Sequence, residues 1–112
     1  MNRSYITKYG TQYNVDSLEF LASLDDNSVD LVMTSPPFAL LRKKEYGNED
    51  QPEYIDWLTQ FARIVFDKLK PSGSFVLDLG GAYKKGLPVR SLYNFRVPIK
   101  FCDEVGFLLA ED

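Results

Sequence analysis

The chain has 112 residues, of which 45% are hydrophobic and 14% aromatic, and this composition predicts a packed core rather than a disordered segment. It contains no histidine and one cysteine, Cys102, which excludes a disulfide framework, a Cys/His zinc site and catalysis by a Ser-His-Asp or Cys-His group. The formal net charge of −3 counts mildly against nucleic-acid binding unless the basic residues are clustered.

The N-terminal third predicts a strand, a helix and a second strand. We expect a short strand over 11–15 and a helix over about 17–24, because Asp16 is a good N-cap and Glu19 stands in the capping-box position. Residues 28–34 form an almost continuous apolar run, which is typical of a buried strand in a parallel sheet.

A rigid turn, Thr34-Ser35-Pro36-Pro37-Phe38, follows this strand at once. Neither proline has a backbone N–H, so the sheet ladder cannot continue and the chain is held extended. The turn therefore fixes a hydroxyl, two carbonyls and an aromatic ring relative to one another. Hydrogen-bond acceptors beside a stacking ring suit a flipped-out nucleobase that carries an exocyclic amine.

A polar stretch, a long helix and another strand come next. Residues 39–51 are irregular and predict a mobile loop, whereas apolar residues recur at helical spacing from Pro52 to Leu69. The segment Pro71-Ser72-Gly73 ends that helix. Residues 74–79 then predict the second strand of the sheet, which a loop over 82–93 follows.

A third helix and a third strand complete the pattern. We expect the helix to run from Asn94 or Pro98 to Val105, with Gly106 at its C′ position, and 107–110 to form the strand. Strands that alternate with helices indicate an α/β fold with a parallel sheet. In such sheets ligands bind at the carboxyl ends of the strands, which is where the proline turn lies.

The turn Ser35-Pro36-Pro37-Phe38 resembles the catalytic motif of the amino-methylating DNA methyltransferases. That motif is written (Ser/Asn/Asp)-Pro-Pro-(Tyr/Phe), and serine in its first place is typical of the cytosine-N4 enzymes. Three further segments resemble the same family in the same order, namely Tyr13–Ser17, Leu69–Asp78 and Asp103–Phe107. The chain is most similar to the PvuII type of restriction-modification methyltransferase, in which the catalytic half precedes the cofactor glycine motif.

This resemblance implies a partial Rossmann-like methyltransferase sheet, mostly parallel, with helices on both faces. Residues 1–112 would be the N-terminal catalytic part of a DNA methylase N4/N6 domain, because the sequence contains neither a Phe-x-Gly-x-Gly cofactor motif nor a target-recognition region. The implied reaction transfers a methyl group from S-adenosylmethionine to the N4 amine of a flipped cytosine in double-stranded DNA. We expect the chain to be inactive alone and to need the C-terminal half of such an enzyme as its partner.

The resemblance also assigns roles to individual residues. Ser35, Pro36, Pro37 and Phe38 would be catalytic: the Ser35 hydroxyl and the Pro36 carbonyl would accept hydrogen bonds from the amine, and Phe38 would stack on the base. No strong base is needed, because the amine becomes acidic only as the new bond forms. Asp16 would lie near the cofactor adenine. It could equally be only a helix cap, and both interpretations stay open.

Residues near the predicted strand ends complete the expected site. The basic run Arg42-Lys43-Lys44 is expected to contact DNA phosphates. Residues 75–83 look like the glycine entry of a cofactor site, but the Gly-x-Gly spacing is absent and no helix follows directly. We therefore assign them to a strand that borders the target-base pocket, with Tyr83 as part of its wall. For Asp78 we favour a hydrogen-bond network, and we predict no metal site.

Three alternatives to a cytosine-N4 enzyme stay open. One is an adenine-N6 DNA methyltransferase, another is a remnant that holds DNA through its basic run without chemistry, and the last is a structural fragment with no function of its own. No apolar run is long enough to span a bilayer and no segment resembles a signal peptide, so we expect a cytoplasmic protein.

Overall fold

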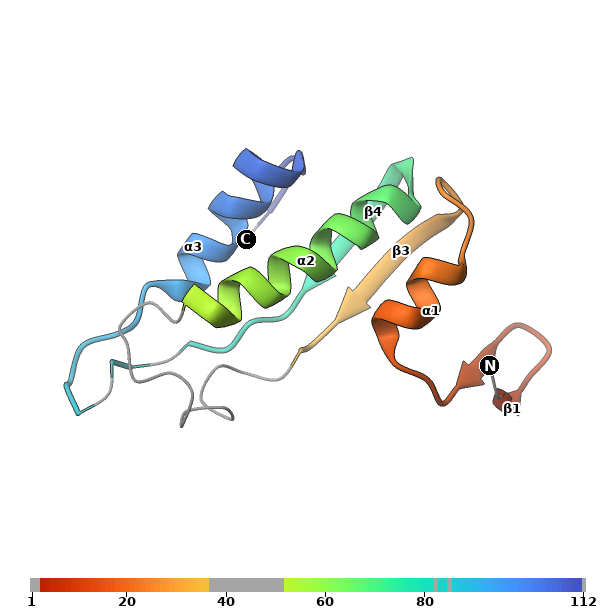
Figure 1. Cartoon of the computed structure of the whole chain (residues 1–112), viewed down its shortest axis with the longest axis horizontal. Helices are drawn as coiled ribbons and strands as arrows, with labels where there is room; N and C mark the ends of the chain where they lie inside the picture. The colour runs from red at the N-terminus through yellow and green to blue at the C-terminus, as the bar shows by residue number, and fades with distance from the viewer. Residues whose placement is uncertain (1–2, 37–51, 82, 85, 112) are drawn as a thin grey trace.

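The computed structural model describes residues 3–36, 52–81, 83–84 and 86–111. Its strands form two small sheets (Figure 1): β1 (Arg3–Ile6) pairs antiparallel with β2 (Thr11–Tyr13), and β3 (Val29–Thr34) pairs parallel with β4 (Leu69–Leu77). The helices are α1 (Ser17–Ser23), α2 (Pro52–Lys68) and α3 (Tyr93–Lys100), which continues into the π-helix η2 (Phe101–Val105). The expected α/β alternation with a parallel pair of strands is confirmed.

Helices cover only one face of the parallel pair β3–β4 in the described part of the chain. Val32 lies beside Phe75 in the ladder, and both side chains pack with residues of α2. Met33 and Val76, which are also partners in the ladder, point to the opposite face and are 68% and 44% exposed. The second layer of helices that the family resemblance implies is not among the residues that the structure describes.

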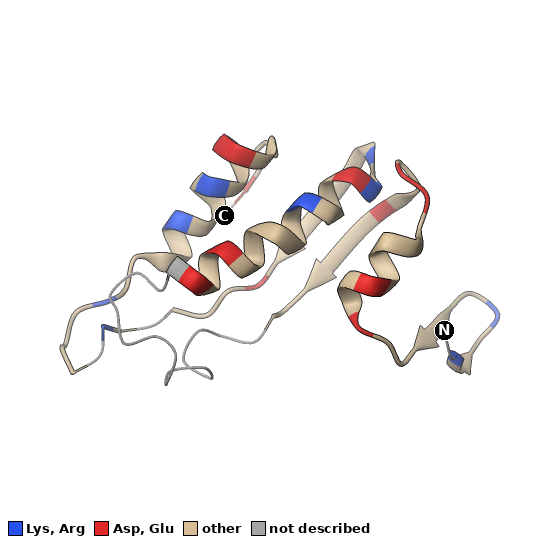
Figure 2. Ribbon diagram, in the orientation of Figure 1, with Lys and Arg blue, Asp and Glu red and all other residues tan. Residues whose placement is uncertain are grey.

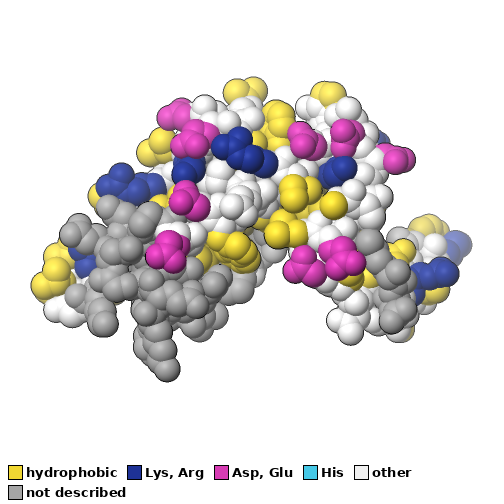
Figure 3. All heavy atoms as spheres, in the orientation of Figure 1, with side chains coloured by type: hydrophobic (Ala, Val, Ile, Leu, Met, Phe, Trp, Pro, Cys, Tyr) yellow, Lys and Arg dark blue, Asp and Glu magenta, His cyan; other side chains and the backbone are white. Residues whose placement is uncertain are grey.

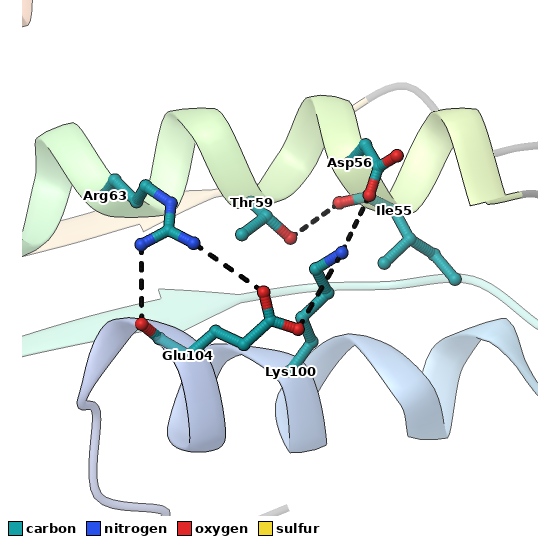
Figure 4. Close-up of polar contacts among 6 residues, drawn as sticks. All are labelled: Ile55, Asp56, Thr59, Arg63, Lys100 and Glu104. Carbon is teal, nitrogen blue, oxygen red and sulfur yellow. Dashed lines mark hydrogen bonds and ion pairs between the residues drawn. The ribbon is translucent and has the colours of Figure 1, made fainter.

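The core lies between α2 and the elements packed against it. The side chains of Tyr54, Leu58 and Val65 on α2 are fully buried, as expected from their helical spacing. From the other side, Tyr93 and Val97 of α3 join the same core. The helix pair is also held at its surface, where Figure 4 shows ion pairs from α2 to α3 and η2: Lys100–Asp56 at 2.7 Å and Arg63–Glu104 at 3.7 Å.

Helix boundaries follow the local sequence signals closely. Asp16 is the N-cap of α1, and its Oδ2 accepts a hydrogen bond from the backbone N–H of Glu19 at 3.2 Å. Gly106 ends η2 with a φ of 113° and donates its N–H to the Phe101 carbonyl. Both predicted caps are therefore confirmed. Pro98, in contrast, does not start its helix.

The helix α3 begins five residues before Pro98 and runs through it. The proline removes one backbone donor from the helix. Burial of the Tyr93 and Val97 side chains in the core offsets this loss, because packing of an apolar face supplies most of the stability of a short helix. Of the two predicted starting points, the one near Asn94 is correct.

One expected strand is absent from the described residues, and one strand was not predicted. The segment 107–110 is not a strand: Leu108 is 93% exposed, and in the described part of the chain no strand pairs with this segment. An extended segment becomes a strand only where a neighbouring edge satisfies its backbone groups. The strand β1 was not predicted, and it forms a hairpin with β2.

The described helices are too short or too polar to cross a membrane. In the view of Figure 3, hydrophobic, acidic and basic side chains are intermixed over α2 and its neighbours, and the N-terminal hairpin forms a lobe set apart from the rest of the molecule.

Candidate active site

The predicted site begins at the carboxyl ends of β3 and β4, which lie side by side. Ser35 follows β3 directly and is exposed, and Asp78 follows β4 directly. The Ser35 hydroxyl donates a hydrogen bond to Asp78 Oδ2 at 3.1 Å. The backbone N–H of Asp78 donates to the Thr34 carbonyl at 3.0 Å and extends the ladder by one step. Parallel pairing therefore brings together two polar side chains that are 43 residues apart.

This geometry confirms that Asp78 belongs to a hydrogen-bond network. It also determines what the serine can offer to a ligand. A hydroxyl has one proton and two lone pairs, and the proton of Ser35 is directed at a carboxylate oxygen. The lone pairs of Ser35 Oγ are then the groups available to accept a hydrogen bond from an incoming N–H.

The rest of the proline turn is described only in part. Pro36 is half-buried next to the exposed Ser35. The other predicted catalytic residues, Pro37 and Phe38, and the predicted DNA-binding run Arg42-Lys43-Lys44 lie outside the described residues. Their roles stay predictions.

Tyr93 supports the chain just beyond Asp78, a role that the sequence analysis did not predict. Its ring is fully buried, and its hydroxyl donates a hydrogen bond to the Gly80 carbonyl. Burial raises the pKa of the Tyr93 phenol above its usual value. The one signal in the sequence was that the tyrosine lies on the apolar side of a helix, where a buried hydroxyl must find a partner.

Asp16 lies at the end of the loop between β2 and α1. Its carboxylate is exposed, and one oxygen caps α1 as described above. A carboxylate has a second oxygen that can accept hydrogen bonds. Helix capping and cofactor contact are therefore chemically compatible at this residue, and its role toward a cofactor stays a prediction.

Tyr83 lies in the segment that follows β4, and its side chain is 54% exposed. It forms an isolated antiparallel bridge with Arg90, whose guanidinium lies over the tyrosine ring at 5.2 Å from its centroid. This cation–π contact fixes the ring at the surface. The place of Tyr83 in the wall of a base pocket stays a prediction.

Charged side chains in the described part of the chain do not form one basic surface. Figure 2 shows Lys and Arg interspersed with Asp and Glu along α2 and along the continuous helix of α3 and η2. Several of them are paired across elements, including Lys68 with Asp26 at 2.8 Å and Lys70 with Asp30 at 3.0 Å. Among the residues with described positions, no cluster of three or more His, Cys, Asp or Glu side chains could hold a metal ion.

Comparisons with known proteins identify the family that this chain resembles. A family model described as DNA methylase matches residues 29–112. The type II methyltransferase M.PvuII of Proteus hauseri is 64% identical over 109 residues, which are 97% of this chain and 32% of that protein. M.BglII of Bacillus subtilis is 40% identical over 70 residues, or 61% of this chain and 19% of that protein.

A solved structure shows the same arrangement of elements. The structure of PvuII DNA methyltransferase (cytosine-N4-specific) matches with a TM-score of 0.87 and 62% sequence identity, over 97% of this chain and 39% of that one. The chain thus spans about a third of the length of M.PvuII and about a fifth of M.BglII.

Proposed function

The chain belongs to the DNA methylase family, and we propose that it is the N-terminal catalytic part of a cytosine-N4 DNA methyltransferase of a restriction-modification system. The substrate would be a cytosine flipped out of double-stranded DNA. Support comes from the serine in the first place of the proline motif and from the high identity to M.PvuII. Since DNA is the substrate, we also propose a cytoplasmic location.

The observation that carries this proposal is the hydrogen bond from Ser35 to Asp78 at the ends of two parallel strands. The amine of cytosine is a poor nucleophile because its lone pair is delocalised into the ring. Acceptors aimed at its N–H bonds favour the pyramidal amine, whose lone pair is then free to attack. Ser35 Oγ would be one such acceptor, because its own proton is directed at Asp78.

The other groups of the turn would complete the binding of the base. The Pro36 carbonyl would be the second acceptor for the amine, Pro37 would keep the turn rigid, and Phe38 would stack on the ring. Tyr83 would form part of the pocket wall. The run Arg42-Lys43-Lys44 would contact phosphates, which supply much of the affinity for DNA.

The proposed cofactor is S-adenosylmethionine, which supplies a methyl group activated by its sulfonium. Among the described residues, Asp16 could contact the adenine of this cofactor. Its carboxylate is exposed, and one of its oxygens is engaged in the helix cap. The second oxygen could accept from the adenine amine. The residues of this chain would mainly position the base, and positioning can account for a large part of such a rate enhancement.

The proposal is tested in a single polypeptide that joins residues 1–112 to the part of M.PvuII that follows its matched segment. We expect this enzyme to transfer labelled methyl groups from S-adenosylmethionine to DNA, and nucleoside analysis to identify N4-methylcytosine. The Ser35→Ala variant should lose about 100-fold or more of the rate. The matched control is Ser28→Ala at the opposite end of β3, where the hydroxyl donates to the Asp25 carbonyl.

Three outcomes would contradict the proposal in different ways. N6-methyladenine as the product would identify an adenine-N6 enzyme. Salt-dependent DNA binding without any methyl transfer would identify a DNA-binding remnant. Equal activity of the Ser35→Ala and Ser28→Ala variants would remove Ser35 from the mechanism. The 112-residue chain alone is expected to transfer no methyl groups.

A further inference from the structure

The loop that leads from β4 to α3 carries basic side chains and no acidic ones. The sequence has no Asp or Glu from Leu79 to Cys102, although the whole chain has a formal net charge of −3. Figure 2 likewise shows Lys and Arg, but no Asp or Glu, along the described part of this loop. The basic residues of the stretch are Lys84, Lys85, Arg90, Arg96 and Lys100. Positive charge is therefore concentrated just beyond the strand end of the candidate site.

Two glycines allow the start of this loop to be held closely by its end. The Gly80 carbonyl accepts a hydrogen bond from the buried Tyr93 hydroxyl. A Cβ added at Gly81 would lie 2.8 Å from Arg90 Nη1, which is closer than real Cβ contacts. The Arg90 guanidinium therefore fills the space that a side chain at position 81 would need. The glycine pair thus admits two side chains from the other end of the same loop.

Arg90 is also held by Tyr83. The two residues form an isolated antiparallel bridge, and the guanidinium lies 5.2 Å from the centroid of the tyrosine ring. Next to this bridge, the backbone N–H of Lys84 donates to the Val89 carbonyl at 2.7 Å. A cation–π contact fixes the position of a guanidinium but satisfies none of its N–H donors.

The charge of Arg90 is not neutralised by the described part of the chain. No carboxylate with a described position forms an ion pair with Arg90, and its side chain is exposed. Basic residues on the helices differ, since Arg63 pairs with Glu104 and Lys100 with Asp56. An arginine that is positioned by neutral groups and has no carboxylate partner is preorganised to bind an anion.

The place of Arg90 in the fold favours a phosphate of the DNA backbone as this anion. The residue that it packs against, Gly81, follows closely after Asp78, which bonds to Ser35. A flipped nucleotide leaves the duplex by rotation about its own backbone, so phosphates lie on both sides of the bound base. A guanidinium beside the strand ends can bind such a phosphate through two parallel N–H groups.

We infer that Arg90 anchors a phosphate of the DNA backbone beside the flipped base, and that Tyr83 and Gly81 keep its guanidinium in position. The inference rests on the proposed function for the choice of DNA as the ligand. It adds a contact on the β4 side of the site, separate from the proline turn and from the basic run that follows it. Phosphate contacts position a duplex and carry no sequence information, so Arg90 would act on the affinity for any DNA.

The test measures DNA binding by the single polypeptide that joins residues 1–112 to the part of M.PvuII that follows its matched segment. Fluorescence anisotropy with two labelled duplexes of unrelated sequence gives Kd at several salt concentrations, without cofactor. Arg90→Gln should weaken binding to both duplexes about tenfold. It should also reduce the slope of log Kd against log salt concentration by about 0.9, the value for one lost phosphate contact.

Two variants separate a specific anchor from a general change of charge. Arg90→Lys keeps the charge but loses the planar fork, so the slope should stay and the affinity should fall less than for Arg90→Gln. Lys8→Gln is the matched control, because Lys8 is exposed and also lies over a tyrosine ring, 5.1 Å from the Tyr9 centroid. Lys8 belongs to the β1–β2 hairpin, at the opposite end of the molecule from the loop before α3 (Figure 1). Lys8→Gln should leave Kd and slope unchanged.

A third variant tests whether the observed position of the guanidinium matters. Gly81→Ala keeps every charge, but the added Cβ would displace Arg90 Nη1. We expect DNA binding to weaken about threefold, because the anchor is no longer preorganised. An unchanged midpoint of thermal unfolding shows that the variant is folded. Unchanged binding would overturn the role of Gly81 in positioning Arg90.

Failure of this inference is distinguishable from failure of the proposed function, because methyl transfer is measured separately. An unchanged slope for Arg90→Gln in an enzyme that still methylates DNA would overturn the anchor alone. An unchanged slope with a lower midpoint of thermal unfolding would assign Arg90 to a carboxylate in the C-terminal part of the enzyme instead. Equal effects of Arg90→Gln and Lys8→Gln would also overturn it. A reduced slope without methyl transfer would support the anchor and contradict the proposed function.

Discussion

At the residue scale, two side chains at the ends of neighbouring strands, Ser35 and Asp78, form the described part of the candidate site. An isolated serine hydroxyl rotates and can donate or accept. With Asp78 Oδ2 at 3.1 Å from Ser35 Oγ, donation is directed to the carboxylate, and acceptance is left for a ligand. The same negative charge favours a bound group that carries partial positive charge on its N–H bonds.

The first prediction replaces Asp78 with asparagine in the single-polypeptide enzyme that joins this chain to the rest of M.PvuII. The new amide can donate to Ser35 Oγ and occupy the lone pair that the substrate amine requires. We expect kcat for methyl transfer to fall about 10- to 100-fold, with no change in the midpoint of thermal unfolding. Asp103→Asn, an exposed aspartate on η2, is the matched control. Equal rates for the two variants would contradict a role for Asp78.

The second prediction concerns the buried Tyr93 phenol. Its pKa is raised by burial above its usual value, so folding favours the neutral form. The contribution of the neutral Tyr93 phenol to the free energy of unfolding is complete below about pH 10. It is lost as the pH rises through the raised pKa. At neutral pH we expect Tyr93→Phe to lower the free energy of unfolding by about 1 kcal/mol. The difference from the parent chain should shrink above about pH 10.

Denaturant unfolding of the 112-residue chain between neutral and alkaline pH measures this difference. Tyr9→Phe is the control, because the Tyr9 side chain is 90% exposed. Its difference from the parent chain should not change with pH in the same way. A pH-independent difference for Tyr93→Phe would show that burial does not bias the phenol toward its neutral form.

At the scale of elements, the sequence predicted an element correctly where its stabilising interactions lie within one segment of the chain. The helices α1 and α2 were predictable because caps and helical spacing act within one segment. The strand expected at 107–110 failed because a strand depends on a neighbour that no local pattern reports. Pro98 was misleading for a related reason, since burial of Tyr93 and Val97 depends on α2.

The third prediction tests the end of η2, where the sequence anticipated a glycine cap. Gly106 has a φ of 113°, and an added Cβ would lie 3.4 Å from Phe66 Cζ. We expect Gly106→Ala to lower the free energy of unfolding by about 1–2 kcal/mol, because a side chain is strained in this region of φ.

Gly10→Ala is the control for this prediction. An added Cβ at Gly10 would make only an ordinary contact of 3.5 Å with Thr7 Oγ1, so the change should stay within about 0.5 kcal/mol. Urea unfolding of both variants checks the pair. Similar losses for the two would mean that the φ of Gly106 does not constrain this helix end.

At the scale of the whole molecule, the sequence could predict a candidate site at a strand end but not the extent of the sheet. The motif at Ser35 was recognisable from its resemblance to a family pattern, and the rule that ligands bind at the carboxyl ends of parallel strands supported a site there. The sequence predicted that Asp78 belongs to a hydrogen-bond network but not that Ser35 is its partner. Identifying the partner requires the register between β3 and β4. The packing of Arg90 against Gly81 could not be predicted, because it depends on how separate segments are placed in three dimensions.

The last prediction concerns the bare face of the parallel pair, which leaves Leu31, Met33 and Val76 51%, 68% and 44% exposed. An exposed apolar face of a sheet promotes association of the isolated chain. We expect the double variant Leu31→Thr/Val76→Thr to reduce concentration-dependent association in sedimentation velocity, with stability nearly unchanged, because threonine suits a solvated strand position.

Val32→Thr tests the opposite face of the same strand and is the control for that double variant. Val32 packs with the core beneath α2, so a hydroxyl there loses burial and needs a hydrogen-bond partner. We expect this change to lower the free energy of unfolding by about 1–2 kcal/mol and to leave association no weaker. A larger loss of stability for the double variant than for Val32→Thr would contradict this assignment of the two faces. It would mean that Leu31 and Val76 pack in the core and that Val32 does not.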